Sequence, residues 1–209
     1  MTTTAVDIRL IRAEDLPVVT DIHMLAFPRA AMTSLGKEAV RRYYLWQMEG
    51  PNDLYATLAE VDGNVAGFSF GGHFRGATIG YLRRNRTFLI LTALRKPWLL
   101  ANPVFLDGVR KGLGQLRRKR GQPMPRKTAA EPRRFGVLAL AVHPSFQGRG
   151  IGHALMDDAE REARRLGVDR MHLTVHPDNT PAVRFYESRG WHRKLDDRGR
   201  WAGYMIKDL

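Results

Sequence analysis

The chain has 209 residues, 44% of them hydrophobic, so it can bury the core of one sizeable α/β domain. It has no cysteine, which excludes disulfide bridges, thiolate metal sites and a covalent acyl-cysteine intermediate. The formal net charge of +13 lies in one segment, because residues 83–134 hold 15 Lys and Arg against 2 Asp and Glu while the rest is balanced.

The N-terminal third predicts a strand, two helices and a hairpin. Residues 7–11 read as a strand, and acidic residues followed by Pro17 mark the start of a helix. A second helix is expected over residues 34–50. Strands 54–61 and 65–70 flank Asp62-Gly63-Asn64, which favours a tight turn. The apolar positions predict buried faces that contain Leu16, Val19, Ile22, His23 and Ala26 in the first helix and Val40, Tyr43, Tyr44 and Met48 in the second.

The middle of the chain, residues 71–134, fits this pattern poorly. A structureless loop of that length would be unusual in a compact domain. We expect helices around residues 88–100 and 104–120 and a flexible return over 121–132. The interpretation is a single domain over residues 1–209, in which 71–134 form an inserted basic helical subdomain or lid.

The C-terminal part alternates strands and helices. A nearly all-apolar strand is predicted over 135–142, as in the centre of a sheet. Helix 150–166 follows, with an apolar stripe that ends at Leu166 and a stop at Gly167. Strand 171–175 precedes a short helix, 181–189, with Thr180 as the candidate N-cap and Pro181 at its first position. Segments 191–195 and 201–206 form a closing pair of strands.

The strongest motif joins the strand 135–142 to the helix that follows it. The glycines of Gln147-Gly148-Arg149-Gly150-Ile151-Gly152 let the backbone approach a ligand closely, and the helix N-terminus adds partial positive charge. Arg149 can add charge-assisted hydrogen bonds. Neither the P-loop nor the dinucleotide-binding spacing is present. The loop therefore predicts a site for a pyrophosphate.

Two motifs resemble the GNAT superfamily of N-acetyltransferases. Gln147-x-x-Gly150-x-Gly152 matches its glycine signature, and Asn179-x-x-Ala182-x-x-Phe185-Tyr186-x-x-x-Gly190-Trp191 matches its second half. The resemblance is loose over residues 7–70 and close over 135–209. A weaker resemblance, over Phe27, residues 32–36 and Tyr43-Tyr44, is to a bacterial subgroup associated with cell-surface polysaccharide synthesis.

The resemblance implies an α/β fold whose mixed, mostly antiparallel sheet splays open between strands 135–142 and 171–175. It implies acetyl-coenzyme A as cofactor, with its pantetheine arm paired to the backbone of Leu140 and Val142. The implied reaction is direct attack of an amine on the thioester. The candidate cofactor-binding residues are Leu140, Val142, Gln147, Gly148, Arg149, Gly150, Ile151, Gly152, Asn179 and Ala182. Asn179 either binds the cofactor or orders the start of the helix.

The chemistry needs an acid for the leaving thiolate and a base for the amine. Tyr186 is the candidate acid. Many relatives carry a glutamate on the strand before the loop, but residues 135–142 contain no acidic side chain. The candidate bases are therefore His143, His172, His176 and Glu60, with His176 preferred, or a chain of waters. No ligand spacing supports a metal site at these histidines.

The acceptor expected is a small-molecule amine, first an amino-sugar intermediate, with a protein N-terminus or lysine as the alternative. A non-catalytic module that binds coenzyme A or an anionic polymer is the rival class. The N-terminus lacks the features of a signal peptide and no apolar run spans a membrane, so we expect a cytoplasmic protein. The basic segment 83–134 either docks on an anionic membrane, as its Trp and Leu content suggests, or covers the acceptor site; nucleic-acid binding is less favoured.

Overall fold

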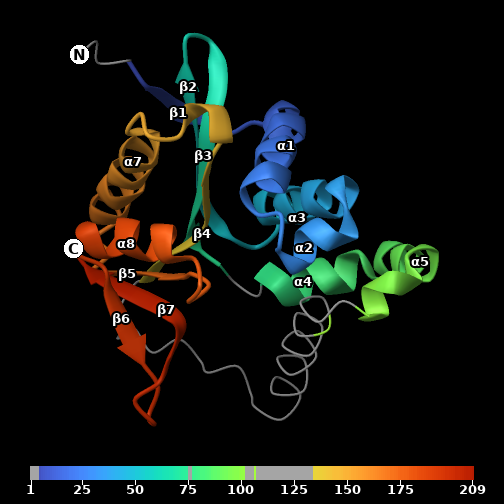
Figure 1. Cartoon of the computed structure of the whole chain (residues 1–209). Helices are drawn as coiled ribbons and strands as arrows, with labels where there is room; N and C mark the ends of the chain where they lie inside the picture. The colour runs from blue at the N-terminus through green and yellow to red at the C-terminus, as the bar shows by residue number, and fades with distance from the viewer. Residues whose placement is uncertain (1–4, 75–76, 102–105, 107–133) are drawn as a thin grey trace.

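The computed structural model describes residues 5–74, 77–101, 106 and 134–209. One seven-stranded sheet runs through the molecule, in the order β1-β2-β3-β4-β5-β7-β6 (Figure 1). All neighbouring strands are antiparallel except β4 and β5. The strands are β1 (Asp7–Leu10), β2 (Asp53–Val61), β3 (Asn64–His73), β4 (Arg134–Val142), β5 (Arg170–Thr174), β6 (His192–Leu195) and β7 (Trp201–Asp208).

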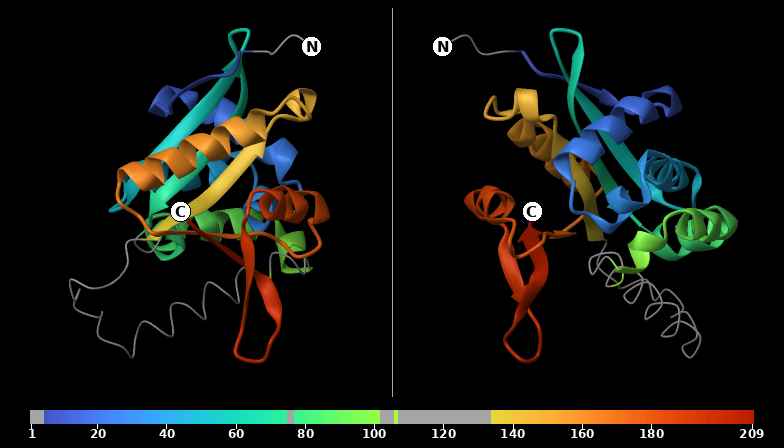
Figure 2. Two further views of the ribbon diagram at one scale, coloured as in Figure 1. Left: turned by 90° about the vertical axis from the view of Figure 1, so that its left-hand side faces the viewer. Right: turned by 45° about the vertical axis from the view of Figure 1, so that its right-hand side comes forward.

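Helices cover both faces of this sheet. Helix α7 (Ile151–Arg165) packs on β2, β3 and β4, and α1 (Leu16–Ala26) packs on the opposite face (Figure 2). Helix α8 (Thr180–Ser188) lies beside β5. The remaining helices are α2 (Ala31–Leu35), α3 (Lys37–Glu49), α4 (Ala77–Arg84) and α5 (Arg86–Arg95), with short 3-10 helices at Ala13–Asp15, Pro97–Ala101 and Pro144–Phe146. The predicted helix-flanked, mostly antiparallel sheet is confirmed.

The two faces of the sheet have separate cores. On the α1 side, Ile22 and Tyr44 pack with Phe68 and Phe70 of β3. On the other face, the inward stripe of α7 packs on the sheet, and Trp191 is fully buried beside it. Large apolar side chains on alternate strand positions therefore clamp the sheet between helices.

The expected second helix is wrong in one respect. Residues 34–50 are divided between α2 and α3 because Gly36 adopts a φ of +103°, a conformation that a helix interior does not allow. Val40 and Tyr44 are buried as expected, whereas Tyr43 and Met48 are half-buried. In α7, the predicted stop at Gly167 is confirmed by its φ of +64°, but Leu166 is exposed because it lies beyond the last turn.

The segment 71–134 also begins differently from the prediction. Strand β3 continues to His73, so residues 71–73 belong to the sheet. The helix expected around 88–100 ends at Arg95, because Pro97 cannot continue it, and a 3-10 turn follows. Apart from Leu106, the helix expected around 104–120 and the return over 121–132 lie outside the described residues. Across the part of the chain that is described, no helix is long and apolar enough to cross a membrane.

The feature that creates the site is the short pairing of β4 with β5. The two strands pair only over Arg134–Val137 and Arg170–Leu173. The C-terminal half of β4 has no strand partner on the side that faces β5. The sheet is therefore open where the glycine-rich loop leaves β4.

Candidate functional site

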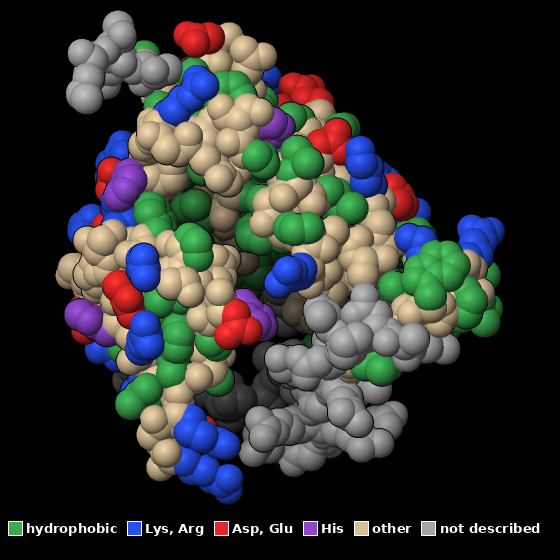
Figure 3. Space-filling view, viewed as in Figure 1, with side chains coloured by type: hydrophobic (Ala, Val, Ile, Leu, Met, Phe, Trp, Pro, Cys, Tyr) green, Lys and Arg blue, Asp and Glu red, His purple; other side chains and the backbone are tan. Residues whose placement is uncertain are grey.

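A cavity of about 740 Å³ occupies the opening between β4 and β5. Figure 3 shows the corresponding hollow on the face toward the viewer, between α8 and the helices α1 and α2. A volume of this size is typical of small-molecule sites. Its walls are the second half of β4, the loop into α7, the end of β5, helix α8, and Ala26 and Phe27 at the end of α1.

The loop between β4 and α7 presents a row of free donors to this cavity. Among the described residues, the backbone N–H groups of 148–153 donate to no other protein group, and the first helical bond of α7 is Ala154 N–H to the Gly150 carbonyl. Gly148 and Gly150 have φ values of +76° and +78°, and a Cβ at either would meet open space. Adjacent unpaired N–H groups at a helix N-terminus form an anion site.

The open edge of β4 adds further backbone groups. The His143 N–H donates to the Ala66 carbonyl at 2.8 Å, which fixes which residues of β4 face β3. Backbone groups alternate between the two edges of a strand, so those of Leu140 and Val142 face the unpaired side. A long contact of 3.4 Å from Gln147 Nε2 reaches the Val142 carbonyl. Leu140 and Val142 can therefore pair with an extended ligand in the cavity.

Tyr186 lies in the cavity wall, contributed by α8. Its side chain is 9% exposed, and its hydroxyl makes no hydrogen bond within the described chain. Burial raises the pKa of Tyr186 to about 12. The phenol is therefore a protonated donor at neutral pH, and its O–H is not committed to another side chain.

Of the four candidate bases, His176 is the one that lines the cavity. Its ring is exposed at the mouth, and Nδ1 accepts the Asp178 N–H at 3.3 Å. Glu60 is instead paired with Arg9 at 2.8 Å, and the His143 Nδ1 accepts the Ser145 N–H at 3.2 Å. His172 does not line the cavity, and burial is the main cause that lowers its pKa. Among the described residues, no three His, Asp or Glu side chains gather as metal ligands would.

The remaining predicted residues also surround the loop and α8. Asn179 caps α8, because its side-chain oxygen accepts the Ala182 N–H at 3.3 Å. The N-cap is thus Asn179, and the prediction of Thr180 is wrong by one position, since Thr180 is already helical. The Arg149 guanidinium lies over the Phe146 ring, 5.2 Å from its centroid, rather than inside the cavity.

The comparisons with known proteins agree with this architecture. Residues 16–191 match the model of the acetyltransferase (GNAT) family. The chain belongs to that family. Over 61 residues it is 43% identical to a mycothiol acetyltransferase of Geodermatophilus obscurus, a match that covers 29% of this chain and 20% of that protein. The chain thus spans about a fifth of the length of this curated relative.

Solved structures of the GNAT family share the fold of the whole chain. The PaiA N-acetyltransferase of Thermoplasma acidophilum, solved in complex with coenzyme A, aligns with a TM-score of 0.58 at 14% identity over 98% of this chain and 99% of its own. The protein yncA of Salmonella typhimurium, solved with its cofactor acetyl-CoA, aligns with a TM-score of 0.55 at 19% identity over 99% and 95% of the two chains.

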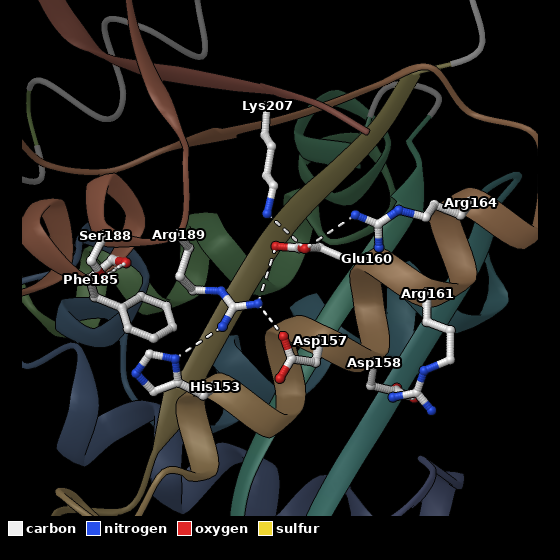
Figure 4. A network of polar contacts seen from close by, with 10 residues as sticks. All are labelled: His153, Asp157, Asp158, Glu160, Arg161, Arg164, Phe185, Ser188, Arg189 and Lys207. Atoms are coloured by element: carbon white, nitrogen blue, oxygen red, sulfur yellow. Dashed lines mark hydrogen bonds and ion pairs between the residues drawn. The ribbon is translucent and has the colours of Figure 1, made fainter.

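In this GNAT chain an ion-pair network joins the two helices of the site, as Figure 4 shows. Arg189, just after α8, donates to Asp157 and lies 3.4 Å from Glu160, both on α7. Glu160 is almost fully buried and also pairs with Lys207 of β7 at 2.7 Å. Charged hydrogen bonds between rigid elements restrict their relative motion. The network therefore fixes α8, which carries Tyr186, against α7.

Several residues of the cavity wall were not among the predicted site residues, and two of them have aromatic rings that contact each other. His153 and Phe185 both line the cavity, and their rings meet edge to face at a centroid distance of 5.0 Å. The Arg189 Nη1–H donates to His153 Nδ1 at 3.0 Å, so the ion-pair network also holds the His153 ring in place. Phe185 belongs to the second motif. Its helical spacing from Ala182 could have indicated that it faces the same cavity. His153 lies in the first turn after the glycines, and no spacing rule marked it.

Proposed function

We propose that this protein transfers an acetyl group from acetyl-coenzyme A to a small-molecule amine. The observation that carries the proposal is the set of N–H groups of residues 148–153, which donate to no group in the described part of the chain and lie at a cavity walled by the free edge of β4 and by Tyr186. Family membership and the ligands of PaiA and yncA support the choice of cofactor.

The residues present fit this cofactor. Gln147, Gly148, Gly150, Ile151 and Gly152, with the backbone N–H of Arg149, would hold the pyrophosphate at the N-terminus of α7, where the open space beside Gly148 and Gly150 admits it. Leu140 and Val142 would pair with the amide groups of the pantetheine arm. Asn179 would act by ordering the start of α8, beside Ala182 in the wall. When bound, the cofactor supplies the activated thioester.

Tyr186 would donate its phenolic hydrogen to the sulfur as the thioester opens. By analogy with cysteine, a thiol of this kind has a pKa of about 8.5. The pKa of Tyr186 is raised to about 12, so complete transfer of its proton is uphill by roughly 5 kcal/mol. Tyr186 therefore stabilises the departing sulfur mainly through the hydrogen bond, and solvent completes the protonation.

The amine must lose a proton as it attacks, and His176 is the side chain at the cavity mouth. While Nδ1 accepts the Asp178 N–H, the neutral ring carries its proton on Nε2 and has no free lone pair. The ring must turn away from Asp178 to act as the base. Water at the mouth is the alternative receiver. Replacement of His176 with Gln distinguishes them, since an unchanged kcat assigns the proton to solvent.

For the acceptor, we propose an amino sugar before other amines. The polysaccharide-subgroup resemblance and the names of relatives as mycothiol acetyltransferases favour a small molecule over a protein. The described lining of the cavity, which includes Ala26 and Phe27 at the end of α1, contains no acidic side chain. Because these relatives are matched over only a fifth of their length, we propose a class of acceptor and not a single compound.

The test is a thiol-release assay with the full chain, acetyl-coenzyme A and three acceptor sets: amino sugars, simple amines and peptides with free N-termini or lysine. We expect release that depends on an amino sugar. Thiol release with peptides alone would mean that the acceptor is a peptide amine and not an amino sugar. Binding of coenzyme A by calorimetry without turnover on any acceptor would favour the non-catalytic module instead.

A further inference from the structure

Helix α5 and the turn after it carry an exposed apolar patch. Ile90, Leu91, Leu94 and Trp98 are 60%, 47%, 73% and 64% exposed. No residue of α5 is buried, so the helix lies on the surface rather than in a core. Figure 3 shows this apolar group at the edge of the molecule, bordered by basic side chains. Several large apolar side chains exposed within nine positions usually mark an interaction site.

The segment that carries the patch has basic side chains and no acidic ones. Residues 77–101 contain no Asp or Glu, and Arg83, Arg86 and Arg95 form no ion pair with any described residue. By contrast, the nearby Arg84 pairs with Glu49 at 3.0 Å, and the Arg42 guanidinium covers the inner ring of Phe88 at 4.6 Å. These two contacts hold α4 and α5 against α3, while Arg83, Arg86 and Arg95 remain available to an anion.

We propose that this patch, defined by Ile90, Leu91, Leu94, Trp98 and the basic residues Arg83, Arg86 and Arg95, docks the protein on an anionic lipid bilayer. A bilayer matches both properties, because its acyl boundary accepts the apolar side chains and its headgroups pair with the arginines. Nucleic acid would use the charge but would leave Leu94 in water. Trp98 is of the residue type that lies at the headgroup level.

The position of the patch agrees with a role at a surface. The hollow of the cavity and the α5 patch are both visible from one side in Figure 3. Docking through α5 would therefore leave the cavity reachable from the bilayer. The apolar side chains point outward and not over the cavity, whose lining contains no residue of α4 or α5. A cover over the acceptor site would instead require these side chains to line it.

The experiment is co-sedimentation of the full chain with phosphatidylcholine vesicles and with vesicles of equal parts phosphatidylcholine and phosphatidylglycerol. We expect binding to the anionic vesicles alone, weakened when the salt is raised from 0.05 M to 0.5 M, since surface charges are screened over roughly 10 Å at 0.1 M salt. The readout is independent of catalysis, so its failure leaves the proposed acetyl transfer standing.

Two pairs of variants separate the apolar and the charged contributions. The double variant Leu94→Ser, Trp98→Ser should bind about tenfold more weakly. Leu195→Ser, at a leucine of β6 that is 52% exposed, should bind as wild type. Arg83→Gln with Arg86→Gln should lose about 25-fold, since each basic side chain near an anionic leaflet is worth about fivefold and the two contributions multiply. Arg12→Gln with Arg198→Gln removes the same charge elsewhere and should lose little.

Three outcomes would overturn the proposal. They are no binding to anionic vesicles at low salt by a folded chain, equal binding to both vesicle types, and equal losses in the patch and control variants. A competition with single-stranded RNA gives a further outcome. If the RNA displaces the protein from vesicles and binds the Leu94→Ser, Trp98→Ser variant as tightly as the wild type, the surface is assigned to nucleic acid.

Discussion

The side chain of Tyr186 ends in a hydroxyl that has no partner within the described chain, inside the wall of the cavity. Replacing Tyr186 with Phe keeps the ring, so the fold and the affinity for coenzyme A should remain. We expect kcat to fall by about 10²–10⁴-fold, the usual worth of a positioned proton donor. Steady-state kinetics with saturating acceptor, together with calorimetry of coenzyme A, measure the two effects.

The control for this variant is a second aromatic residue in the same wall. Phe185→Leu alters packing without removing a hydrogen-bond donor. It should therefore change the affinity for acetyl-coenzyme A more than it changes kcat. If Tyr186→Phe retained wild-type kcat where chemistry limits the rate, the donor role of the hydroxyl would be wrong.

Gly152 allows a sharper test of the anion site than the other loop glycines. A side chain at Gly148 or Gly150 would have to adopt a left-handed φ, which costs about 1–2 kcal/mol. Gly152 is helical, and a Cβ there would lie 3.7 Å from Phe185, an ordinary contact. Gly152→Glu places a carboxylate where the pyrophosphate is expected and should weaken coenzyme A binding by at least tenfold, as read by calorimetry.

The matched variant Gly152→Gln has the same length without the charge. If the site binds an anion at the helix N-terminus, Gln should retain clearly more affinity than Glu. Equal losses would mean that bulk alone blocks the cavity. Thermal unfolding of both variants should stay near that of the wild type, because acidic residues suit the first turn of a helix.

At the scale of elements, Arg189 and Glu160 hold α8 against α7 and β7. Arg189→Met leaves the buried Glu160 with Lys207 at 2.7 Å and Arg164 at 3.8 Å, so we expect a loss of about 2–3 kcal/mol in the free energy of unfolding. Urea unfolding measures it. The control is Arg193→Met, which breaks an exposed pair with Glu187 and should cost below about 1 kcal/mol.

The same network predicts a catalytic effect that stability alone would not give. If Arg189 positions Tyr186 through α8, Arg189→Met should lower kcat at temperatures where the variant is fully folded. Wild-type kcat under those conditions would restrict Arg189 to a structural role.

The elements show what sequence patterns can and cannot predict. The strands, α7 and α8 followed from apolar periodicity and from Pro and Gly punctuation, which are local properties of the chain. The break at Gly36 did not, because a glycine in a helical pattern does not by itself reveal a positive φ. The network at Glu160 was also not predictable, since Glu160 and Lys207 are 47 positions apart in the chain.

For the whole molecule, the pH dependence of stability should reflect His23. This ring shares a 2.7 Å hydrogen bond with Tyr44 between α1 and α3, and burial lowers its pKa to about 4 from 6.5. The unfolded chain then binds more protons between these values, so stability is full above pH 6.5 and falls as the pH drops towards 4. The loss amounts to roughly 3 kcal/mol.

Urea unfolding at pH 7 and pH 4.5 measures this loss. His23→Gln keeps a hydrogen-bonding group beside Tyr44 but does not titrate, so its stability should fall less over the same interval. Carboxylates whose pKa is lowered by arginine, such as Asp15 and Glu38, contribute equally in both proteins. Parallel losses in the two proteins would contradict the assignment to His23.

The fold as a whole was predictable because the resemblance rests on two motifs that lie on either side of the open sheet. The position of most candidate cofactor residues around the cavity was predictable for the same reason, since they belong to the end of β4, the loop and the start of α8. The base was not, because it depends on which side chains the folded chain brings to the cavity mouth. Glu60 and His143 lie outside the cavity wall and bind other groups, which no spacing in the sequence indicates.

The one-sided pairing of β4 should also be visible in hydrogen–deuterium exchange. The amides of Ala139, Ala141 and His143 face β3 and should exchange slowly, while those of Leu140 and Val142, on the open edge, should exchange fast. A central strand would thus show alternating protection along its length. Coenzyme A that lies along this edge would slow the fast amides and leave the slow ones unchanged, so residue-resolved exchange would map its path without any substitution.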